Sequence, residues 1–255
     1  MLLTIDVGNT NIVLGGFCGE KLLFVERLST DARKTDSEYA VKIREILALN
    51  SNSEKIDGCI ISSVVPPLTK KIKAAVKTVY GIESFVVGPG IKTGINLKVD
   101  NPAQVGADII CACVAAYNLY DRPVLVTDMG TATKMIVVDE DASFRGVSII
   151  PGLETSLKAL AGSAALLPEI SLEAPEKVIA KNTVECMKSG AIYGNASLVD
   201  GMIDRIFEEL GEKATLVATG GLSEIVIPHC RHKITLDENL LLKGLCIIYN
   251  KNVLN

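Results

Sequence analysis

The chain has 255 residues, enough for one large domain or two half-size ones, and it carries a formal net charge of −4. Its lysines and arginines are scattered and form no basic stripe, so we expect no nucleic-acid partner. Hydrophobic residues make up 48% of the chain and aromatic residues only 4%. Such an aliphatic core suits a buried parallel sheet covered by helices.

The N-terminus and the cysteines indicate where the protein works. No stretch approaches the ~20 uncharged apolar residues of a membrane-spanning helix. The segment from Met1 reaches a carboxylate at Asp6 with no basic region before it, which favours a first strand over a signal peptide. The seven cysteines are dispersed without CxxC pairs, as is typical of reduced thiols. We therefore expect a cytoplasmic protein with no membrane partner.

The first third of the sequence predicts a hairpin, a third strand and a helix. Apolar residues 2–5 lead into turn residues 6–10, and apolar residues resume at 12–14. Residues 22–28 are predicted as the third strand. The apolar spacing of residues 37–49 predicts a helix.

The next segment predicts a β-rich strand ended by two prolines, a helix, a short strand and a glycine-punctuated loop, at residues 59–65, 68–80, 85–87 and 88–94. A long helix is predicted over residues 103–119, with Pro102 near its start. Arg122 and Pro123 then break the chain, and residues 124–127 begin a new strand.

The new strand repeats the pattern of the N-terminus. Residues 3–11 align with residues 125–133, and each copy has an apolar strand, an Asp, one residue, a Gly and small polar residues. Because the repeat recurs about halfway along the chain, it predicts two similar lobes rather than a solenoid. We place the division near residue 120, giving lobes at 1–120 and 121–255 that face each other across a cleft.

The repeated hairpin suits phosphate binding. Its turn exposes backbone N–H groups, and glycine lets the backbone approach a phosphate closely. The Asp at the strand end can hold a hydrated Mg²⁺ or a monovalent cation that offsets the phosphate charge. Asp and Gly are also ordinary hairpin residues, so a single copy would indicate little. Two copies at matching places favour a ligand site.

A third element is the strand at residues 216–219, which runs into the double-glycine turn Gly220-Gly221. Such a turn can lie flat against an adenine or a ribose, although by itself it is as typical of a plain strand-to-helix connection. Two phosphate hairpins followed by a Gly-Gly turn is the layout of the actin-like, sugar-kinase-like ATPase superfamily. We therefore expect an α/β fold with two ribonuclease-H-like lobes, each a mixed sheet flanked by helices.

Within that superfamily the chain resembles the type III pantothenate kinases over nearly its whole length. The resemblance is carried by ordered segments at residues 6–11, 62–67, 88–94, 102–108, 128–133, 146–160, 182–190 and 218–221. None of these segments is specific alone, but their order is. The resemblance implies ATP-dependent phosphorylation of pantothenate to 4'-phosphopantothenate, the first step of coenzyme A biosynthesis.

The resemblance also implies roles for individual residues. Asp108 would be the base that accepts the hydroxyl proton. The ATP and its phosphates would be bound by Asp6, Val7, Gly8, Asn9, Thr10, Asn11, Ile12, Val13, Thr131, Gly220 and Gly221. Pantothenate would be contacted by Val99, Gly106, Ala107, Asp108, Ile109 and Thr183.

The cofactors and the assembly follow from the same resemblance. Mg²⁺ would accompany ATP and be held by Asp6 through water, and Asp128 would bind a monovalent cation, K⁺ or NH₄⁺. Members of the family are homodimers with the substrate pocket near the subunit interface, so the expected partners are ATP, pantothenate and a second copy of the chain.

The residues around Asp108 support a functional role independently. Asp108 lies in a mostly apolar predicted helix, where an acid is costly unless it is paired or functional. The alternative is a partly exposed Asp in the first turn, which the helix dipole favours.

Three positions depart from the family pattern. Ile109 stands where an Arg is usual, Val99 where an aromatic residue is usual, and Lys134 where a Thr is usual. These departures leave two alternatives to an active pantothenate kinase. One is a catalytically impaired nucleotide-binding paralogue with a regulatory or partner-subunit role, and the other is a kinase for another small alcohol.

Overall fold

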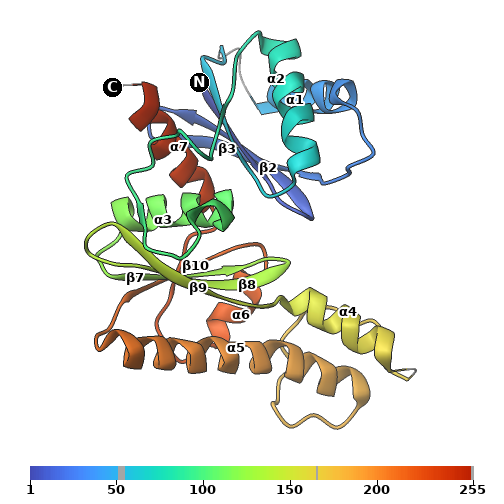
Figure 1. The fold of residues 1–255 in the computed structure, drawn as a ribbon. Helices are drawn as coiled ribbons and strands as arrows, with labels where there is room; N and C mark the ends of the chain where they lie inside the picture. The colour runs from blue at the N-terminus through green and yellow to red at the C-terminus, as the bar shows by residue number, and fades with distance from the viewer. Residues whose placement is uncertain (51–54, 165, 254–255) are drawn as a thin grey trace. The chain divides into compact units, whose positions relative to one another are not determined.

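The structure is a computed structural model that describes residues 1–50, 55–164 and 166–253. The chain forms two compact units. The first unit comprises residues 1–96 and 100–118 together with the segment that begins at Asn239. The second unit comprises residues 97–99 and 119–238. Figure 1 shows the elements of both, coloured from blue at the N-terminus to red at the C-terminus.

The first unit is built on a five-stranded mixed sheet in the order β3-β2-β1-β4-β5. Strand β1 pairs antiparallel with β2, which pairs antiparallel with β3, whereas β4 lies parallel to both β1 and β5. The strands are β1 (Leu2–Val7), β2 (Asn11–Cys18), β3 (Lys21–Ser29), β4 (Gly58–Ser63) and β5 (Phe85–Val86).

Helices cover both faces of this sheet. The core between the sheet and helices α1 (Asp36–Asn50) and α2 (Pro66–Tyr80) contains alternate residues of β1, namely Leu3, Ile5 and Val7. The intervening residues of β1 point to the other face, where Thr4 lies beside Gly15 and the side chain of Leu242 in α7 (Leu240–Val253). Asp6 belongs to this second set, so the strand alternation directs its carboxylate away from α1 and α2.

Helix α3 (Ala107–Leu119) packs against α7 with almost no space between the two backbones. A Cβ on Gly244 of α7 would overlap the carbonyl oxygen of Cys111 in α3. Glycine at position 244 therefore sets how closely the two helices approach.

Two differences from the sequence predictions have clear physical causes. The predicted helix over residues 103–119 is a short 3₁₀ turn, η1 (Pro102–Gln104), followed by α3, with Gly106 between them. The C-terminal segment, predicted in the second lobe, packs with the first unit instead. Its Tyr249 ring stacks edge-on against Phe85, with centroids 5.7 Å apart, and Gly58 makes room for the same tyrosine.

The second unit has a six-stranded sheet in the order β11-β10-β7-β8-β9-β6. Strands β7, β8 and β9 pair antiparallel in succession, and β10 lies parallel to β7 and β11. The strands are β6 (Asn96–Leu97), β7 (Val124–Met129), β8 (Ala132–Val138), β9 (Ser143–Pro151), β10 (Thr215–Thr219) and β11 (Thr235–Leu236).

The first five strands of that order repeat the topology of the first sheet. Read from β9, the second sheet has the order β9-β8-β7-β10-β11, which corresponds to β3-β2-β1-β4-β5 in the first. In each sheet the first three of these strands pair antiparallel, and the last two continue parallel to the third. The prediction of two similar lobes, each with a mixed sheet flanked by helices, is thereby confirmed.

The long helix α5 (Thr183–Leu210) packs on one face of the second sheet. Ile192, Val199 and Ile203 of this helix share a core with Leu125 and Met129 of β7. Asp128 lies between these β7 positions in the alternation and so points to the opposite face. The remaining helical elements are α4 (Leu153–Ser163), α6 (Ser223–Val226) and η2 (Ile227–His229).

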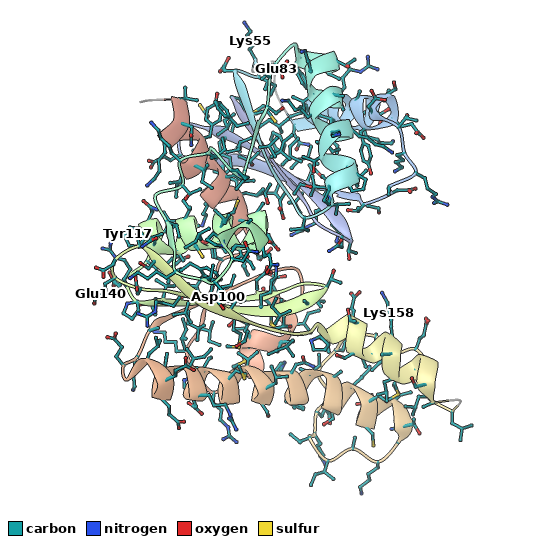
Figure 2. The ribbon with its side chains drawn as sticks, viewed as in Figure 1. Lys55, Glu83, Asp100, Tyr117, Glu140 and Lys158 are labelled. Atoms are coloured by element: carbon teal, nitrogen blue, oxygen red, sulfur yellow. The ribbon has the colours of Figure 1, made fainter. Side chains whose placement is uncertain are left out.

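Charged side chains are exposed on both units. Figure 2 labels five charged side chains, all of which are exposed: Lys55, Glu83, Asp100, Glu140 and Lys158. None of the helices in the described residues is long and apolar enough to cross a membrane.

The contact between α3 and α7 yields a stability prediction. Gly244→Ala should lower the free energy of unfolding by about 1–3 kcal/mol, because the new methyl group overlaps backbone that cannot swing aside. Denaturant unfolding of the purified variants measures the change. Gly194→Ala is the matched control, since no described atom beyond its own stretch of helix lies within 4 Å of the added Cβ, and alanine is favoured over glycine in a helix interior by about 1 kcal/mol. Equal stability of Gly244→Ala and the unmodified chain would contradict the proposed packing.

Candidate active site

The first candidate phosphate loop is the hairpin between β1 and β2. Asp6 is the cross-strand partner of Val13, and the amide of Gly8 donates to the carbonyl oxygen of Asn11 at 3.0 Å. Asn9, Thr10 and Asn11 at the tip are exposed. The loop thus presents backbone and neutral polar groups at the end of a buried strand, as phosphate binding requires.

Thr30, which sequence reasoning missed, holds this loop in place. Its amide donates to the carbonyl oxygen of Thr10 at 3.0 Å, and its hydroxyl donates to the carbonyl oxygen of Gly8 at 2.7 Å. Both bonds engage carbonyl groups, so they steady the loop without using its N–H donors. Thr30 immediately follows β3, and no motif marks it in the sequence.

The second candidate phosphate loop joins β7 to β8 and is one residue shorter. The amide of Gly130 donates to the carbonyl oxygen of Ala132 at 3.1 Å. The start of α4 fastens the exposed Thr131, whose carbonyl oxygen accepts from the amide of Gly152 at 3.1 Å and from the hydroxyl of Thr155 at 2.8 Å. The segment after the second motif therefore supports the loop itself.

The two residues of the Gly-Gly turn do different things. Gly220 has a φ of 92°, and a Cβ there would lie 2.5 Å from the carbonyl oxygen of Met129. That same oxygen accepts from the amide of Leu222 at 3.2 Å, so the turn packs against the second hairpin. No described atom lies within 4 Å of a Cβ built on Gly221, which is exposed. Gly220 is thus required by packing, whereas Gly221 leaves open space.

Asp108, the predicted catalytic base, is half-buried in the first turn of α3. Its Oδ1 accepts from the amide of Ile109 at 2.8 Å. A Cβ on Gly106 would overlap the same carboxylate oxygen. Gly106 therefore acts on the site by leaving room for the Asp108 carboxylate in this position.

The first unit brings Asp6 and Asp108 toward one buried thiol. Burial raises the pKa of Cys111 well above its ordinary value, and the Asp6 carboxylate is the next largest cause of the rise, whereas the Ser62 hydroxyl lowers it. The Asp108 carboxylate also raises this pKa. Cys111 itself stays a neutral thiol and is no candidate nucleophile.

The predicted substrate residues are divided between the two units. Gly106, Ala107, Asp108 and Ile109 lie at the start of α3 in the first unit, where Ile109 is only 7% exposed. Val99 follows β6, and Thr183 begins α5, both in the second unit.

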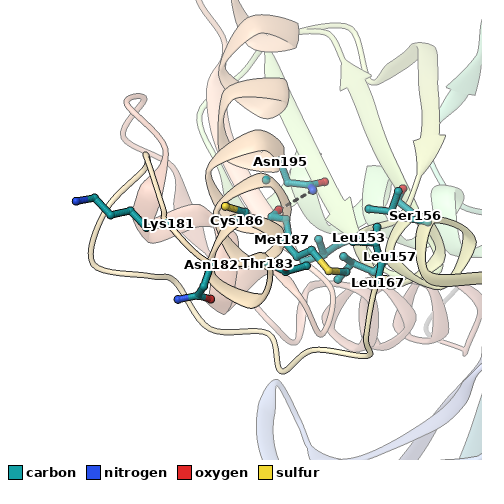
Figure 3. Close-up of a pocket in the computed structure, with 13 residues that line it drawn as sticks. Leu153, Ser156, Leu157, Leu167, Lys181, Asn182, Thr183, Cys186, Met187 and Asn195 are labelled. Carbon is teal, nitrogen blue, oxygen red and sulfur yellow. Dashed lines mark hydrogen bonds between the residues drawn. The ribbon is translucent and has the colours of Figure 1, made fainter. Parts of the chain in front are cut away.

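Thr183 lines a cavity of about 640 Å³ between α4 and the start of α5. Figure 3 shows the apolar side chains of Leu153, Leu157, Leu167 and Met187 gathered there, while Lys181 points away from them. Asn182 caps α5 by accepting from the amide of Glu185 at 3.0 Å. The lining is mainly apolar, which suits an aliphatic group.

Asp128 carries an ion pair that sequence reasoning did not anticipate. Lys134 Nζ lies 2.6 Å from Asp128 Oδ2, and the two residues are cross-strand partners in the β7–β8 ladder. The ammonium group therefore already offsets the charge of the carboxylate on which the monovalent cation was predicted.

Two sheets of like topology, each with a glycine hairpin behind a buried strand, define a kinase-like ATPase of the actin-like fold. The sequence pattern of the family described as type III pantothenate kinase matches residues 2–205. Type III pantothenate kinases of Exiguobacterium sp. strain AT1b and Halalkalibacterium halodurans are 43% and 41% identical to the chain. The alignments cover 99% of the chain and 99% and 100% of those relatives. The chain belongs to the type III pantothenate kinase family.

Solved structures share the fold at low sequence identity. A Campylobacter jejuni protein described as a Baf family transcriptional activator aligns with a TM-score of 0.61 at 18% identity, covering 98% of both chains. Component A of (R)-2-hydroxyglutaryl-CoA dehydratase from Acidaminococcus fermentans aligns with a TM-score of 0.59 at 14% identity, covering 100% of the chain and 99% of that protein. These likenesses concern the fold alone.

The position of the Asp108 carboxylate can be tested through Gly106. In Gly106→Ala the added methyl group displaces the carboxylate, and such a misplacement should lower kcat for phosphoryl transfer by about 100-fold. The affinity for Mg·ATP should stay unchanged, as measured by calorimetry. Gly194→Ala serves as the control for adding a methyl group to glycine. A Gly106→Ala variant with unaltered kcat would show that Asp108 needs no such clearance.

Proposed function

We propose that the chain transfers the γ-phosphoryl group of ATP to the primary hydroxyl of pantothenate, forming 4'-phosphopantothenate for coenzyme A biosynthesis. Two carboxylates of the first unit carry the proposal. Asp6 lies near the end of β1 beside a phosphate hairpin, and Asp108 lies in the first turn of α3, where its Oδ1 accepts from the amide of Ile109. The family and the relatives at 41–43% identity support the same reaction.

The two hairpins bind the nucleotide phosphates. Residues 8–11 and 130–132 form tight turns whose carbonyl groups are held by Thr30 in one case and by the start of α4 in the other. Loops fixed in this way are preorganised, and little reorganisation is needed when charge shifts during phosphoryl transfer. The open face of Gly221 gives the adenosine moiety a flat surface.

Asp6 would hold Mg²⁺ through water, and the ion would offset the negative charge of the phosphoryl group of ATP. The carboxylate suits this role because it lies near the end of β1, beside the phosphate hairpin. A hydrated ion needs only one or two protein carboxylates when ATP supplies further oxygen ligands.

Asp108 accepts the proton of the attacking hydroxyl. Its position at the first turn of α3 is fixed by the hydrogen bond from the amide of Ile109 and by the clearance at Gly106. Val99 and Thr183 contact the remainder of pantothenate, and the apolar cavity beside Thr183 accommodates aliphatic parts of the substrate. The reaction takes place in the cytoplasm, as the reduced cysteines suggest.

Replacing Asp108 separates catalysis from binding. Asp108→Asn should lower pantothenate-dependent ATP turnover by about 100-fold or more, because the amide cannot accept the proton. Asp6→Asn should instead weaken Mg·ATP binding in calorimetry. Asp121→Asn removes an exposed carboxylate outside the site and serves as the control.

The results also decide between the remaining functions. Nucleotide binding without turnover on pantothenate, combined with no effect of Asp108→Asn, would favour a nucleotide-binding regulator. Turnover on other small alcohols but not on pantothenate would place the chain among kinases with a different acceptor. The absence of nucleotide binding would contradict all three.

We further propose that the chain forms a homodimer through the surface of the second unit around the cavity. Large apolar side chains are exposed there: Leu160 (46%), Leu166 (92%), Val178 (65%), Ile179 (85%) and Val184 (39%). Such a concentration of exposed apolar side chains in α4, at the start of α5 and in the segment between them is typical of an interface rather than of a free surface.

A charge at this surface should dissociate the dimer. Ile179→Glu should convert the dimer into a monomer in light scattering coupled to size exclusion, because the interface would bury an unpaired carboxylate. Leu49→Glu is the matched control, since Leu49 is 84% exposed on α1 of the first unit. A dimer that survives Ile179→Glu but not Leu49→Glu would place the interface on the first unit.

A further inference from the structure

An ion pair shielded from water joins the two strands of the second phosphate hairpin. The side chains of Lys134 and Asp128 are 16% and 10% exposed, whereas those of the surface pair Lys42 and Glu45 are 51% and 54% exposed. Charges that are largely removed from water interact more strongly and are screened less by salt than charges at the surface.

The cross-strand neighbour of the carboxylate differs between the two hairpins. Asp6 stands opposite Val13, which has no side-chain donor, whereas Asp128 stands opposite Lys134. The two copies of the motif therefore share a strand-end carboxylate beside a phosphate loop, and in the second copy the cross-strand neighbour of that carboxylate is a lysine.

An ammonium group on Asp128 does what a small monovalent cation would do there. It neutralises the carboxylate, so that this strand end no longer repels phosphates bound at the adjacent loop. The lysine head group is a compact point charge with three N–H donors, so its chemistry is close to that of an ammonium ion attached to the chain.

We infer that Lys134 supplies, from within the chain, the positive charge that K⁺ or NH₄⁺ would otherwise bring to Asp128. Nucleotide binding and phosphoryl transfer then proceed without a monovalent cation. The inference rests on the proposed function for its effect on turnover, but its effect on nucleotide binding requires only the phosphate role of the hairpin. Lys134 acts on the phosphates by its charge, and Asp128 positions it.

The experiment uses calorimetry at constant ionic strength to measure the Kd of the chain for the Mg²⁺ complex of a non-hydrolysable ATP analogue. The monovalent cation of the buffer is tetramethylammonium, K⁺ or NH₄⁺. For the unmodified chain the Kd should differ by less than about twofold among the three, since a tenfold difference is the scale of one lost charged contact. Pantothenate-dependent turnover is measured in the same buffers.

The decisive variant is Lys134→Thr, which removes the ammonium and leaves space and a hydroxyl oxygen beside Asp128. In tetramethylammonium its Kd should rise by about tenfold or more, and K⁺ or NH₄⁺ should restore most of the loss. Lys42→Thr removes a lysine from an exposed ion pair and should respond to no cation.

Each outcome decides the matter. Weaker binding by the unmodified chain in tetramethylammonium would overturn the inference, as would a Lys134→Thr variant that binds normally or is not rescued by either ion. If Lys134→Thr is not rescued by either ion, the ion pair contributes to stability alone. If thermal melting shows that Lys134→Thr does not fold, the response of the unmodified chain decides. Normal cation-independent nucleotide binding without turnover on pantothenate would contradict the proposed function and leave this inference standing.

Discussion

The placement of a carboxylate at the end of a buried strand, directly before a glycine turn, is the constraint on which the rest of the site depends. Strand alternation sends Leu3, Ile5 and Val7 into one core and leaves Asp6 on the opposite face. The same alternation buries Leu125 and Met129 and turns Asp128 away from α5. Hydrophobic burial thus fixes the strands, and the strands fix the direction of both carboxylates.

Close backbone packing then refines these positions. Glycines do this where a Cβ would overlap a neighbouring atom, at Gly106 beside Asp108, at Gly220 beside Met129 and at Gly244 between α3 and α7. Each lies within one unit and ties a motif to the element beside it. Thr30 and Thr155 donate to carbonyl oxygens of the phosphate loops, so these contacts use none of the loops' N–H groups.

The sequence predicted the repeated hairpins, the two mixed sheets and the family, because each depends on local patterns that recur in order. It missed the Lys134–Asp128 pair for a specific reason. Aligned residue by residue, Lys134 corresponds to Ile12, but the second loop is one residue shorter, so the register places Lys134 at the position that Val13 holds in the first hairpin. Cross-strand register depends on loop length, which the alignment of motifs does not reveal. The packing of the C-terminal segment with the first unit likewise depends on Tyr249 and Gly244, contacts made across long sequence separations.

The central claim is that the chain phosphorylates the primary hydroxyl of pantothenate, and identification of the product tests it most directly. Purified chain is incubated with Mg·ATP and pantothenate, or with an analogue in which that hydroxyl is replaced by hydrogen, and the products are examined by ³¹P NMR and mass spectrometry. The account predicts a phosphomonoester on pantothenate, formed in step with ADP, and no phosphorylated product from the analogue. ATP consumption with an unmodified pantothenate pool, or the same phosphorylated yield from both compounds, would contradict it.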